Sequence, residues 1–573
     1  MLQRKKTLSY WKVKQIALVY LTLPLACFFF GYLRWCLTLA CCCALAFVLW
    51  RILKEQKIDN GELPRNVSDL QVMADYSAKT VLLVFLVTLL WTYLGGMNGY
   101  FYQSWDWAWR NAIYFDLIEY EWPVIYPQTG SALVYYLGHW MPPAAMAKGV
   151  VALTGSLQAG MTAGRFFLWL WSSAGLTIIL LMLFHVLPAR TVKKRFFAVL
   201  LFILFRGMDV IGAIKEGNLG YLTNPTVTNW QHFHLERWCQ GYEFSSVTTC
   251  IYWVFNQTII PWMITLCFLE EGSPANYVFY CVVCLLCGTL PCVGLAVLMV
   301  VKAIAYGFIK VREKRILVFV SRVFSLQNLV SFIVLFPVIA AFILSCNTVR
   351  FVKGSNILSN IQLFSSAYAK EETVNEGNKE TTSEFGVEPE IKTGDETIAI
   401  QDKTENNRLF SGIYKNRNFF IFLFLEVGCY MLLIWGDHRK DFLFYVIGLC
   451  FRIFPDIQIG ESNDFCMRAT IPGLFILMVY TTRFLLDHFP TRKNQKNRKD
   501  GSYRCAVAVL LAGALIIGSV TPIVEIYRGI YNVSTKGTIF LEDQRVMTFR
   551  DRVPDNFACS NPEEHFFFQY LAR

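Results

Sequence analysis

Charged residues are scarce in this chain of 573 residues, of which 17% are Asp, Glu, Lys or Arg. A soluble protein has about 25%, so the composition argues against a soluble globular domain. Hydrophobic residues make up 55% of the chain and gather in runs long enough to cross a bilayer. These runs are continuous, which argues against a transmembrane β-barrel. The expected fold is therefore all-α, a polytopic α-helical membrane protein.

Other signals are also absent. No internal repeat is found, and no small-residue cleavage site follows the first apolar run, so we expect that run to be retained as a span. The 18 cysteines lie mainly in apolar runs, where cysteine behaves as a small hydrophobe. Cys281, Cys284 and Cys287 have a metal-like spacing but no His or acid beside them. A disulfide framework and a zinc site are therefore not expected.

The apolar runs predict about thirteen transmembrane helices. They fall near 16–32, 35–53, 80–96, 163–187, 196–214, 250–269, 276–289, 292–309, 328–346, 418–436, 441–455, 471–487 and 504–521. Basic stretches lie at 4–14, 51–57, 190–195, 311–315, 437–440 and 492–499. With a cytoplasmic N-terminus, thirteen crossings place every basic stretch in the cytoplasm, as positive loops prefer.

Charge is unevenly distributed along the chain. Residues 370–407 hold eleven acids and four lysines, a net charge of −7. The whole chain carries +11, so the residues outside this segment carry +18. We expect the basic surplus to face anionic lipid, and we do not expect nucleic-acid binding. The acidic segment is poor in aromatics and too polar to fold alone, which predicts disorder.

These features divide the chain into five expected regions. They are a transmembrane hairpin with a cytoplasmic linker (1–79), a transmembrane core (80–365) with external loops 97–162 and 215–249, an acidic disordered insertion (366–408), a second transmembrane core (409–521) and an external C-terminal tail (522–573).

The expected external segments share an unusual mixture of aromatic and charged residues. Trp and Tyr gather at membrane interfaces, and anchoring alone explains about half of these aromatics. Interleaved acids are not needed for anchoring, but a sugar pocket uses both, because sugar rings stack on aromatic rings while carboxylates bind hydroxyls. The external loops are therefore expected to form the active-site face.

Two motifs in these segments have competing interpretations. His232, His234 and Glu236 could bind a metal, but the motif is short and common, so polar loop histidines are favoured and no metal site is assigned. Arg468 could hold a phosphate group in a bidentate geometry. Alternatively it forms an ion pair with Asp464, four residues earlier.

An external loop with an acid after an early span, followed by many spans and further external loops, resembles the C-type fold of polytopic glycosyltransferases. Three segments are also similar to stretches in uncharacterised bacterial members of this superfamily: "WDWAWRN" (105–111), "YEFSSVTTCIYWVFNQTIIPW" (242–262) and "NDFCMRATIP" (463–472). The resemblance implies a donor sugar carried on a polyprenyl phosphate lipid. It implies transfer with inversion to a glycan, lipid or protein acceptor on the non-cytoplasmic side of a bacterial plasma membrane.

Carried onto this chain, the resemblance makes Asp106 the general base that takes a proton from the acceptor hydroxyl. No nucleotide sugar is implied, and no glycine-rich phosphate loop is present. No cofactor is assigned, and a divalent cation is left open. The candidate substrate-binding residues are Trp105, Trp107, Arg110, Asp116, Glu119, Glu121, His232, His234, Glu236, Gln257, Asn463, Asp464 and Arg468.

Other functions fit parts of the same pattern. A lipid-linked oligosaccharide polymerase or ligase shares the donor and the external acids. A lipid or solute transporter places ionisable residues within the membrane, whereas here the centres of the spans read as nearly charge-free. That reading favours the enzyme, and the dense polar and aromatic loops argue against an assembly protein without catalysis.

Overall fold

The computed structural model describes residues 7–58, 75–104, 106–217, 235–239, 241–349, 418–457, 464–488, 499–536 and 548–573. The expected all-α fold is observed. The helices are α1 (Tyr10–Tyr32), α2 (Trp35–Ile58), α3 (Ala78–Leu94), α4 (Trp107–Glu119), α5 (Met141–Thr154), α6 (Leu157–Val186), α7 (Val192–Leu204), α8 (Asp209–Lys215), α10 (Val247–Val254), α11 (Ile259–Glu270), α12 (Tyr277–Cys287), α13 (Thr289–Arg312), α14 (Ile316–Val323), α15 (Leu326–Val330), α16 (Phe336–Leu344), α19 (Cys429–His438), α20 (Phe442–Ile453), α21 (Asp464–Ala469), α22 (Ile471–His488), α23 (Lys499–Gly518) and α24 (Val520–Lys536).

Eight helical stretches among the described residues are long and apolar enough to cross a membrane, which indicates a multi-pass membrane protein. Some of them join consecutive helices of the chain. They are Tyr10–Tyr32, Trp35–Glu55, Leu157–Val186, Val192–Lys215, Thr289–Arg312, Ile316–Leu344, Asn418–His438 and Tyr503–Thr535.

The other five expected spans have a different form. The run expected at 250–269 is divided between α10 with its 3₁₀ extension and α11, which meet at an angle of 101°. The run at 441–455 gives only α20, whose 12 residues extend about 18 Å and cannot cross about 30 Å of hydrocarbon. Helices α3 and α12 are short apolar helices of 17 and 11 residues. Helix α22 has 18 residues but is not among the eight apolar stretches.

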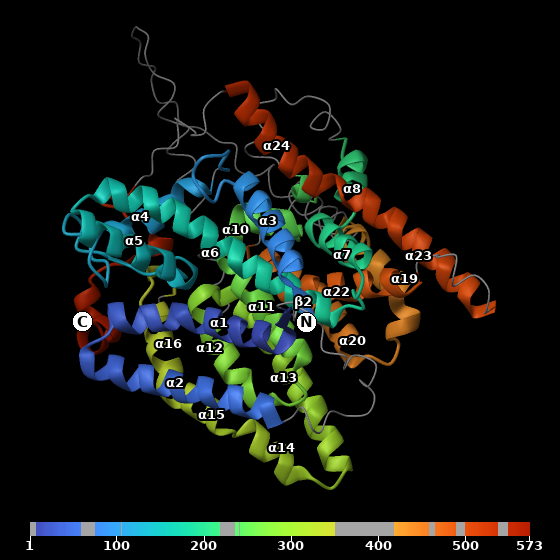
Figure 1. The fold of residues 1–573 in the computed structure, drawn as a ribbon, viewed down its shortest axis with the longest axis horizontal. Helices are drawn as coiled ribbons and strands as arrows, with labels where there is room; N and C mark the ends of the chain where they lie inside the picture. Colours follow the sequence, from blue (N-terminus) through green and yellow to red (C-terminus); the bar gives the residue numbers. More distant parts are fainter. Residues whose placement is uncertain are drawn as a thin grey trace, which may run out of the picture.

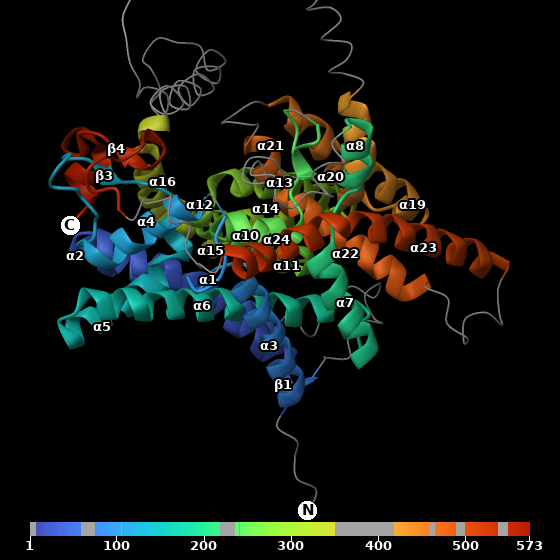
Figure 2. The same ribbon diagram turned by 90° about the horizontal axis from the view of Figure 1, so that it is seen from above.

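The elements that carry the candidate site lie on one side of the helical body. Figure 2 shows the labels for α8, α21, β3 (Ala132–Leu133) and β4 (Ala558–Cys559) along the top of the view, with the N-terminus at the bottom. In Figure 1 the C-terminus lies at the left, beside the ends of α1 and α2, whereas α23 extends to the right. Segments far apart in the sequence therefore share one face.

The C-terminal segment is folded against the first expected external loop. Strand β4 pairs antiparallel with β3, and the carbonyl of Phe557 accepts a hydrogen bond from the amide of Val134. The amide of Arg573 donates to the carbonyl of Tyr32, at the end of α1. The region expected as a tail is thus part of the packed structure in its described residues 548–573. The acidic insertion expected at 366–408 lies outside the described residues.

One further small sheet ties the first helix to the third. Strand β1 (Thr7–Ser9) pairs antiparallel with β2 (Asp75–Ser77), directly before α1 and α3 respectively. The hydroxyl of Tyr76 donates to the carbonyl of Leu181 in α6 at 2.7 Å. The starts of α1 and α3 are therefore fixed together beside the C-terminal half of α6.

Candidate functional site

Asp106 stands directly before α4 and is held by a residue one helical turn later. The guanidinium of Arg110 donates to Asp106 Oδ2 at 2.8 Å and to the Asp106 carbonyl at 3.1 Å. The Asp106 side chain is 32% exposed, whereas that of Arg110 is 9% exposed. The second carboxylate oxygen of Asp106 has no partner among the residues that the structure describes. Arg110 thus orients a carboxylate that is still accessible.

A second arginine–carboxylate pair is formed within α21. Arg468 Nη2 lies 3.2 Å from Asp464 Oδ2, one helical turn apart, so the expected ion pair is present. The Arg468 side chain is 15% exposed, and its Nε is buried without a hydrogen-bond partner among the described residues. Burial raises the pKa of Asp464, Arg468 opposes the shift, and the carboxylates of Asp106 and Glu243 raise the pKa further.

The charges of both pairs act on Tyr135. Burial raises the pKa of its phenol. The charges of Arg468 and Arg110 lower that pKa, and those of Asp464 and Asp106 raise it. All four charged groups therefore act on one hydroxyl, although they come from segments more than 350 residues apart. Gln257, at the bend between α10 and α11, donates from Nε2 to Tyr135 Oη at 3.4 Å.

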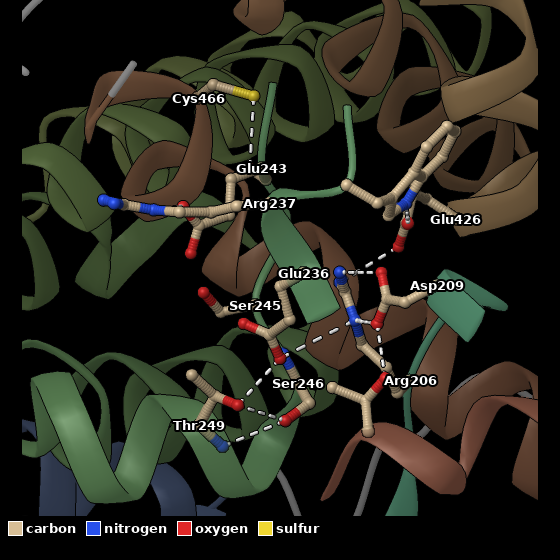
Figure 3. Close-up of polar contacts among 12 residues, drawn as sticks. Arg206, Asp209, Glu236, Arg237, Glu243, Ser245, Ser246, Thr249, Glu426 and Cys466 are labelled. Carbon is tan, nitrogen blue, oxygen red and sulfur yellow. Dashed lines mark hydrogen bonds and ion pairs between the residues drawn. The ribbon is translucent and has the colours of Figure 1, made fainter. Parts of the chain in front are cut away.

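A third pair lies on the loop that precedes α10. Arg237 Nε is 3.2 Å from Glu243 Oε2, and the Arg237 side chain is 45% exposed. The loop contacts α21 directly, because Cys466 Sγ donates to the carbonyl of Glu243 at 3.4 Å. Figure 3 shows this contact, with the Arg237 guanidinium pointing away from the cluster around Arg206.

Beneath the loop, a buried cluster joins one arginine to three carboxylates (Figure 3). Arg206 makes a bidentate contact with Asp209 and an ion pair of 3.0 Å with Glu426, and its Nε lies 3.7 Å from Glu236. All four residues are at most 2% exposed. With all four side chains ionised the cluster would carry a net charge of −2, so burial favours protonation of a carboxyl group. Burial raises the pKa of Glu236 to about 8, with Arg206 opposing the shift.

The buried cluster fixes both ends of the Arg237 loop. Glu236 Oε1 accepts hydrogen bonds from the Ser246 amide at 2.9 Å and from Thr249 Oγ1 at 2.7 Å. Ser246 in turn caps α10 by accepting from the Thr249 amide at 2.9 Å. Since Glu236 adjoins Arg237 and Ser246 opens α10, the cluster holds the loop at its base.

This cluster corrects the expectation that the spans are nearly charge-free at their centres. Arg206 and Asp209 lie in the stretch Val192–Lys215, and Glu426 lies in Asn418–His438. The three charges are tolerated because they face one another and because Trp238 and Thr521 donate further hydrogen bonds to Glu426 and Asp209. The argument against a transporter that rested on charge-free spans is therefore wrong.

Several predicted site residues are buried in packing contacts and do not face the Asp106–Arg110 and Asp464–Arg468 pairs. Trp107 is 2% exposed, stacks on Phe255 with ring centres 5.0 Å apart, and donates its indole N–H to the carbonyl of Tyr252. Asp116 is completely buried and accepts hydrogen bonds from Tyr126 and the amide of Phe549. Both are bound in structural contacts, as is Glu236, so a direct substrate contact is not supported for these three.

Glu119 and Glu121 lie at the C-terminal end of α4, whereas Asp106 lies at its N-terminal end. Helix α4 has 13 residues, about 20 Å at the usual rise, and Asp106 stands before its first residue. Glu119 closes the helix and lies 3.7 Å from Arg550 of the C-terminal segment, while Glu121 is exposed beyond it. The structure therefore separates these acids from the site.

Four predicted residues fall outside the described residues, so the structure does not place them. They are Trp105, His232, His234 and Asn463. Within the described ranges, no group of three or more His, Cys, Asp or Glu side chains is arranged to hold a metal ion. The site described above is accordingly built from arginines, carboxylates and tyrosines.

Sequence reasoning missed Tyr135 and the buried cluster. The signal for the cluster was available, since Arg206 and Glu426 interrupt the apolar runs "LFILFRGM" and "FLFLEVGC", and such charges inside spans are rarely without a role. Tyr135 gave no such signal, because tyrosine is common in interfacial loops.

No family model, no curated protein and no solved structure matches this chain. Function is therefore argued from the site itself.

Proposed function

We propose that the protein is an integral membrane glycosyltransferase that uses a polyprenyl-phosphate-linked sugar. The observation that supports this most is an accessible acid and a mostly buried arginine whose charges both act on Tyr135. Asp106 is an accessible carboxylate oriented by Arg110. Arg468 is a mostly buried guanidinium whose Nε has no hydrogen-bond partner among the described residues. A transferase with a lipid phosphate leaving group needs both a base and a cation.

In the proposed reaction, the acceptor hydroxyl attacks the anomeric carbon of the donor sugar. The bond from that carbon to the lipid phosphate oxygen breaks, the lipid phosphate leaves, and the hydroxyl proton passes to Asp106. A single displacement inverts the anomeric configuration. Asp106 must lie within hydrogen-bond reach of the hydroxyl, and Arg468 would stabilise the charge on the departing phosphate.

The location of this chemistry also belongs to the proposal. With the thirteen crossings expected from the sequence, the basic stretches and the N-terminus would lie in the cytoplasm, and the site segments would face the opposite side of a bacterial plasma membrane. A lipid-linked donor is compatible with that side, because no soluble nucleotide sugar is required. The acceptor would be a glycan, a lipid or a protein that reaches the same face.

The test compares Asp106→Asn with Asp456→Asn in lipid nanodiscs. Asp456 also pairs with an arginine one turn away, Arg452, but is 56% exposed, so it controls for loss of a carboxylate in such a pair. With a panel of polyprenyl-phosphate sugars, we expect D106N to lower transfer ~100- to 10,000-fold, the usual range of general-base catalysis. Binding of polyprenyl phosphate should be unchanged, and D456N should match the wild type.

Two results would overturn the proposal. One is sugar transfer by D106N at the wild-type rate. The other is a wild-type protein that binds no polyprenyl phosphate and consumes no donor of the panel.

A transporter for a lipid or solute is the second candidate, and the buried charges favour it. Ionisable groups inside spans and broken helices are common at transport sites, and the Arg206 cluster and the 101° bend supply both. Reconstituted vesicles distinguish the candidates. Transport that survives D106N, without any consumption of donor sugar, would favour the transporter.

A further inference from the structure

Arg237 has an unused capacity to bind an anion. Only its Nε has a partner among the described residues, Glu243 at 3.2 Å, and the side chain is 45% exposed. A guanidinium carries five N–H donors in a planar fork. The two terminal nitrogens therefore have no partner within the described ranges, and Figure 3 shows them directed away from the buried cluster.

The position of Arg237 is set by contacts on both sides of it. Glu236, the preceding residue, is bonded to Ser246 and Thr249. The carbonyl of Glu243 accepts a hydrogen bond from Cys466 in α21, the helix that also carries Asp464 and Arg468. The Arg237 loop and α21 are thus in direct contact.

Among the described residues, the charges of the site are balanced before any ligand enters. Three arginines and three carboxylates form three pairs: Arg110 with Asp106 at 2.8 Å, Arg237 with Glu243 at 3.2 Å and Arg468 with Asp464 at 3.2 Å. An added anion can hydrogen-bond the terminal nitrogens of Arg237, but Glu243, which holds Nε of the same guanidinium, would repel it. Binding is therefore strongest when the carboxylate gives up its place on Arg237. Phosphate oxygens fit that exchange, since they accept the same bidentate hydrogen bonds as a carboxylate.

We infer that Arg237 and Arg468 together bind a phosphate or diphosphate group, and that Glu243 is the resting counterion which the ligand replaces on Arg237. This inference rests on the proposed function, to which it adds a second phosphate-binding residue. The anion belongs either to a lipid headgroup or to a free phosphate, because both present the same oxygens.

The experiment measures binding of two probes to purified protein in nanodiscs: polyprenyl phosphate in the bilayer and inorganic pyrophosphate in solution. Arg237→Ala should weaken binding ~10- to 100-fold, the range for a lost charged hydrogen bond. Arg237→Lys should recover only part of that affinity, because an ammonium cannot form the fork. Arg452→Ala is the matched control, since Arg452 is also 45% exposed and paired with one carboxylate.

The Glu243→Gln variant distinguishes a counterion role of Glu243 from a structural role in the loop. Removing the resting counterion should tighten binding of the anion, whereas damage to the loop would weaken it. The inference is overturned if R237A and E243Q both bind the probes as the wild type does while Arg468→Ala does not. That result would leave the proposed function standing. If the wild type binds neither probe and consumes no sugar donor, the proposed function itself is overturned.

The two probes also identify the source of the phosphate. Tight binding of polyprenyl phosphate with weak binding of pyrophosphate supports a lipid headgroup. The reverse order supports a soluble phosphate ligand. In both cases the effects of R237A and E243Q must have opposite signs for the inference to stand.

Discussion

The guanidinium of Arg206 lies 3.0 Å from the carboxylate of Glu426, although 220 residues separate them in the chain. Each belongs to a different apolar stretch, and both are 2% exposed. The pair therefore joins two parts of the helical body. In either apolar run alone the charge would have no partner, which is costly. It also underlies the Arg237 loop, through the shared neighbour Glu236.

Arg206→Met should be strongly destabilising. The substitution keeps an unbranched side chain but leaves Asp209, Glu236 and Glu426 without their common cation, and breaking a buried charge pair costs about 3–5 kcal/mol. Unfolding in detergent, followed by intrinsic fluorescence, measures the free-energy change. Arg439→Met, at an exposed position after α19, is the control. Equal stability of the two variants would contradict the role assigned to Arg206.

Glu236 should make stability depend on pH. Its pKa is about 8 in the folded protein and about 4.3 when unfolded, so the folded state holds the proton more tightly. The stabilising contribution is fully present below about pH 4.3 and is lost as the pH rises toward 8. Melting temperatures in nanodiscs should therefore fall between pH 5 and 8 more steeply for the wild type than for Glu236→Gln.

A parallel substitution at an exposed acid controls for the global effect of pH. Glu564→Gln, in the C-terminal segment, should retain the slope of the wild type. If E236Q and the wild type lose stability in parallel over this range, the Glu236 carboxyl does not carry the proton.

The sequence predicts the apolar helices well where they are long and continuous. The runs expected at 16–32, 35–53 and 163–187 correspond to α1, α2 and α6 within several residues. The run at 250–269 was predicted as one span, but it bends by 101° next to Thr258. Hydropathy reports how apolar a segment is and carries no information about such a bend.

The candidate site was only partly accessible to sequence reasoning. Asp464 and Arg468 could be paired from their spacing of four residues, and the structure contains that pair. The partners of Arg206 could not be predicted, because Glu426 and Glu236 approach it only through tertiary packing. Trp107 and Asp116 were assigned to the site from composition, which cannot distinguish a buried residue from one that faces a ligand.

Asp116→Asn should loosen the C-terminal segment without disturbing Asp106. Asp116 Oδ2 accepts hydrogen bonds from Tyr126 Oη at 2.7 Å and the Phe549 amide at 2.9 Å, and an amide replaces an acceptor that carries charge. We expect the free energy of unfolding to fall by about 1–3 kcal/mol and proteolysis within residues 548–573 to become faster. Glu121→Gln, an exposed change five residues later and just beyond α4, should have neither effect. Unchanged proteolysis in D116N would contradict this anchoring role.

Gly294→Ala should displace the helix that carries Asp464 and Arg468. A Cβ at Gly294 in α13 would lie 1.9 Å from the carbonyl oxygen of Ala469, at the end of α21, so the backbone of one helix must move. At Gly149 in α5, by contrast, an added Cβ has no atom within 4 Å. Both changes are glycine to alanine within helices, with the same gain in helix propensity, so their difference isolates the clash.

We therefore expect Gly294→Ala to weaken polyprenyl phosphate binding at least tenfold, because the shift moves Arg468 relative to Tyr135 and Arg237. Gly149→Ala should bind as the wild type does and be slightly more stable. Binding in nanodiscs and the melting temperature of each variant measure the two effects separately. If G294A binds the lipid normally, α21 can move without altering the site. The placement of the phosphate between Arg237 and Arg468 would then be wrong, since that placement requires α21 and the Arg237 loop to keep their contact.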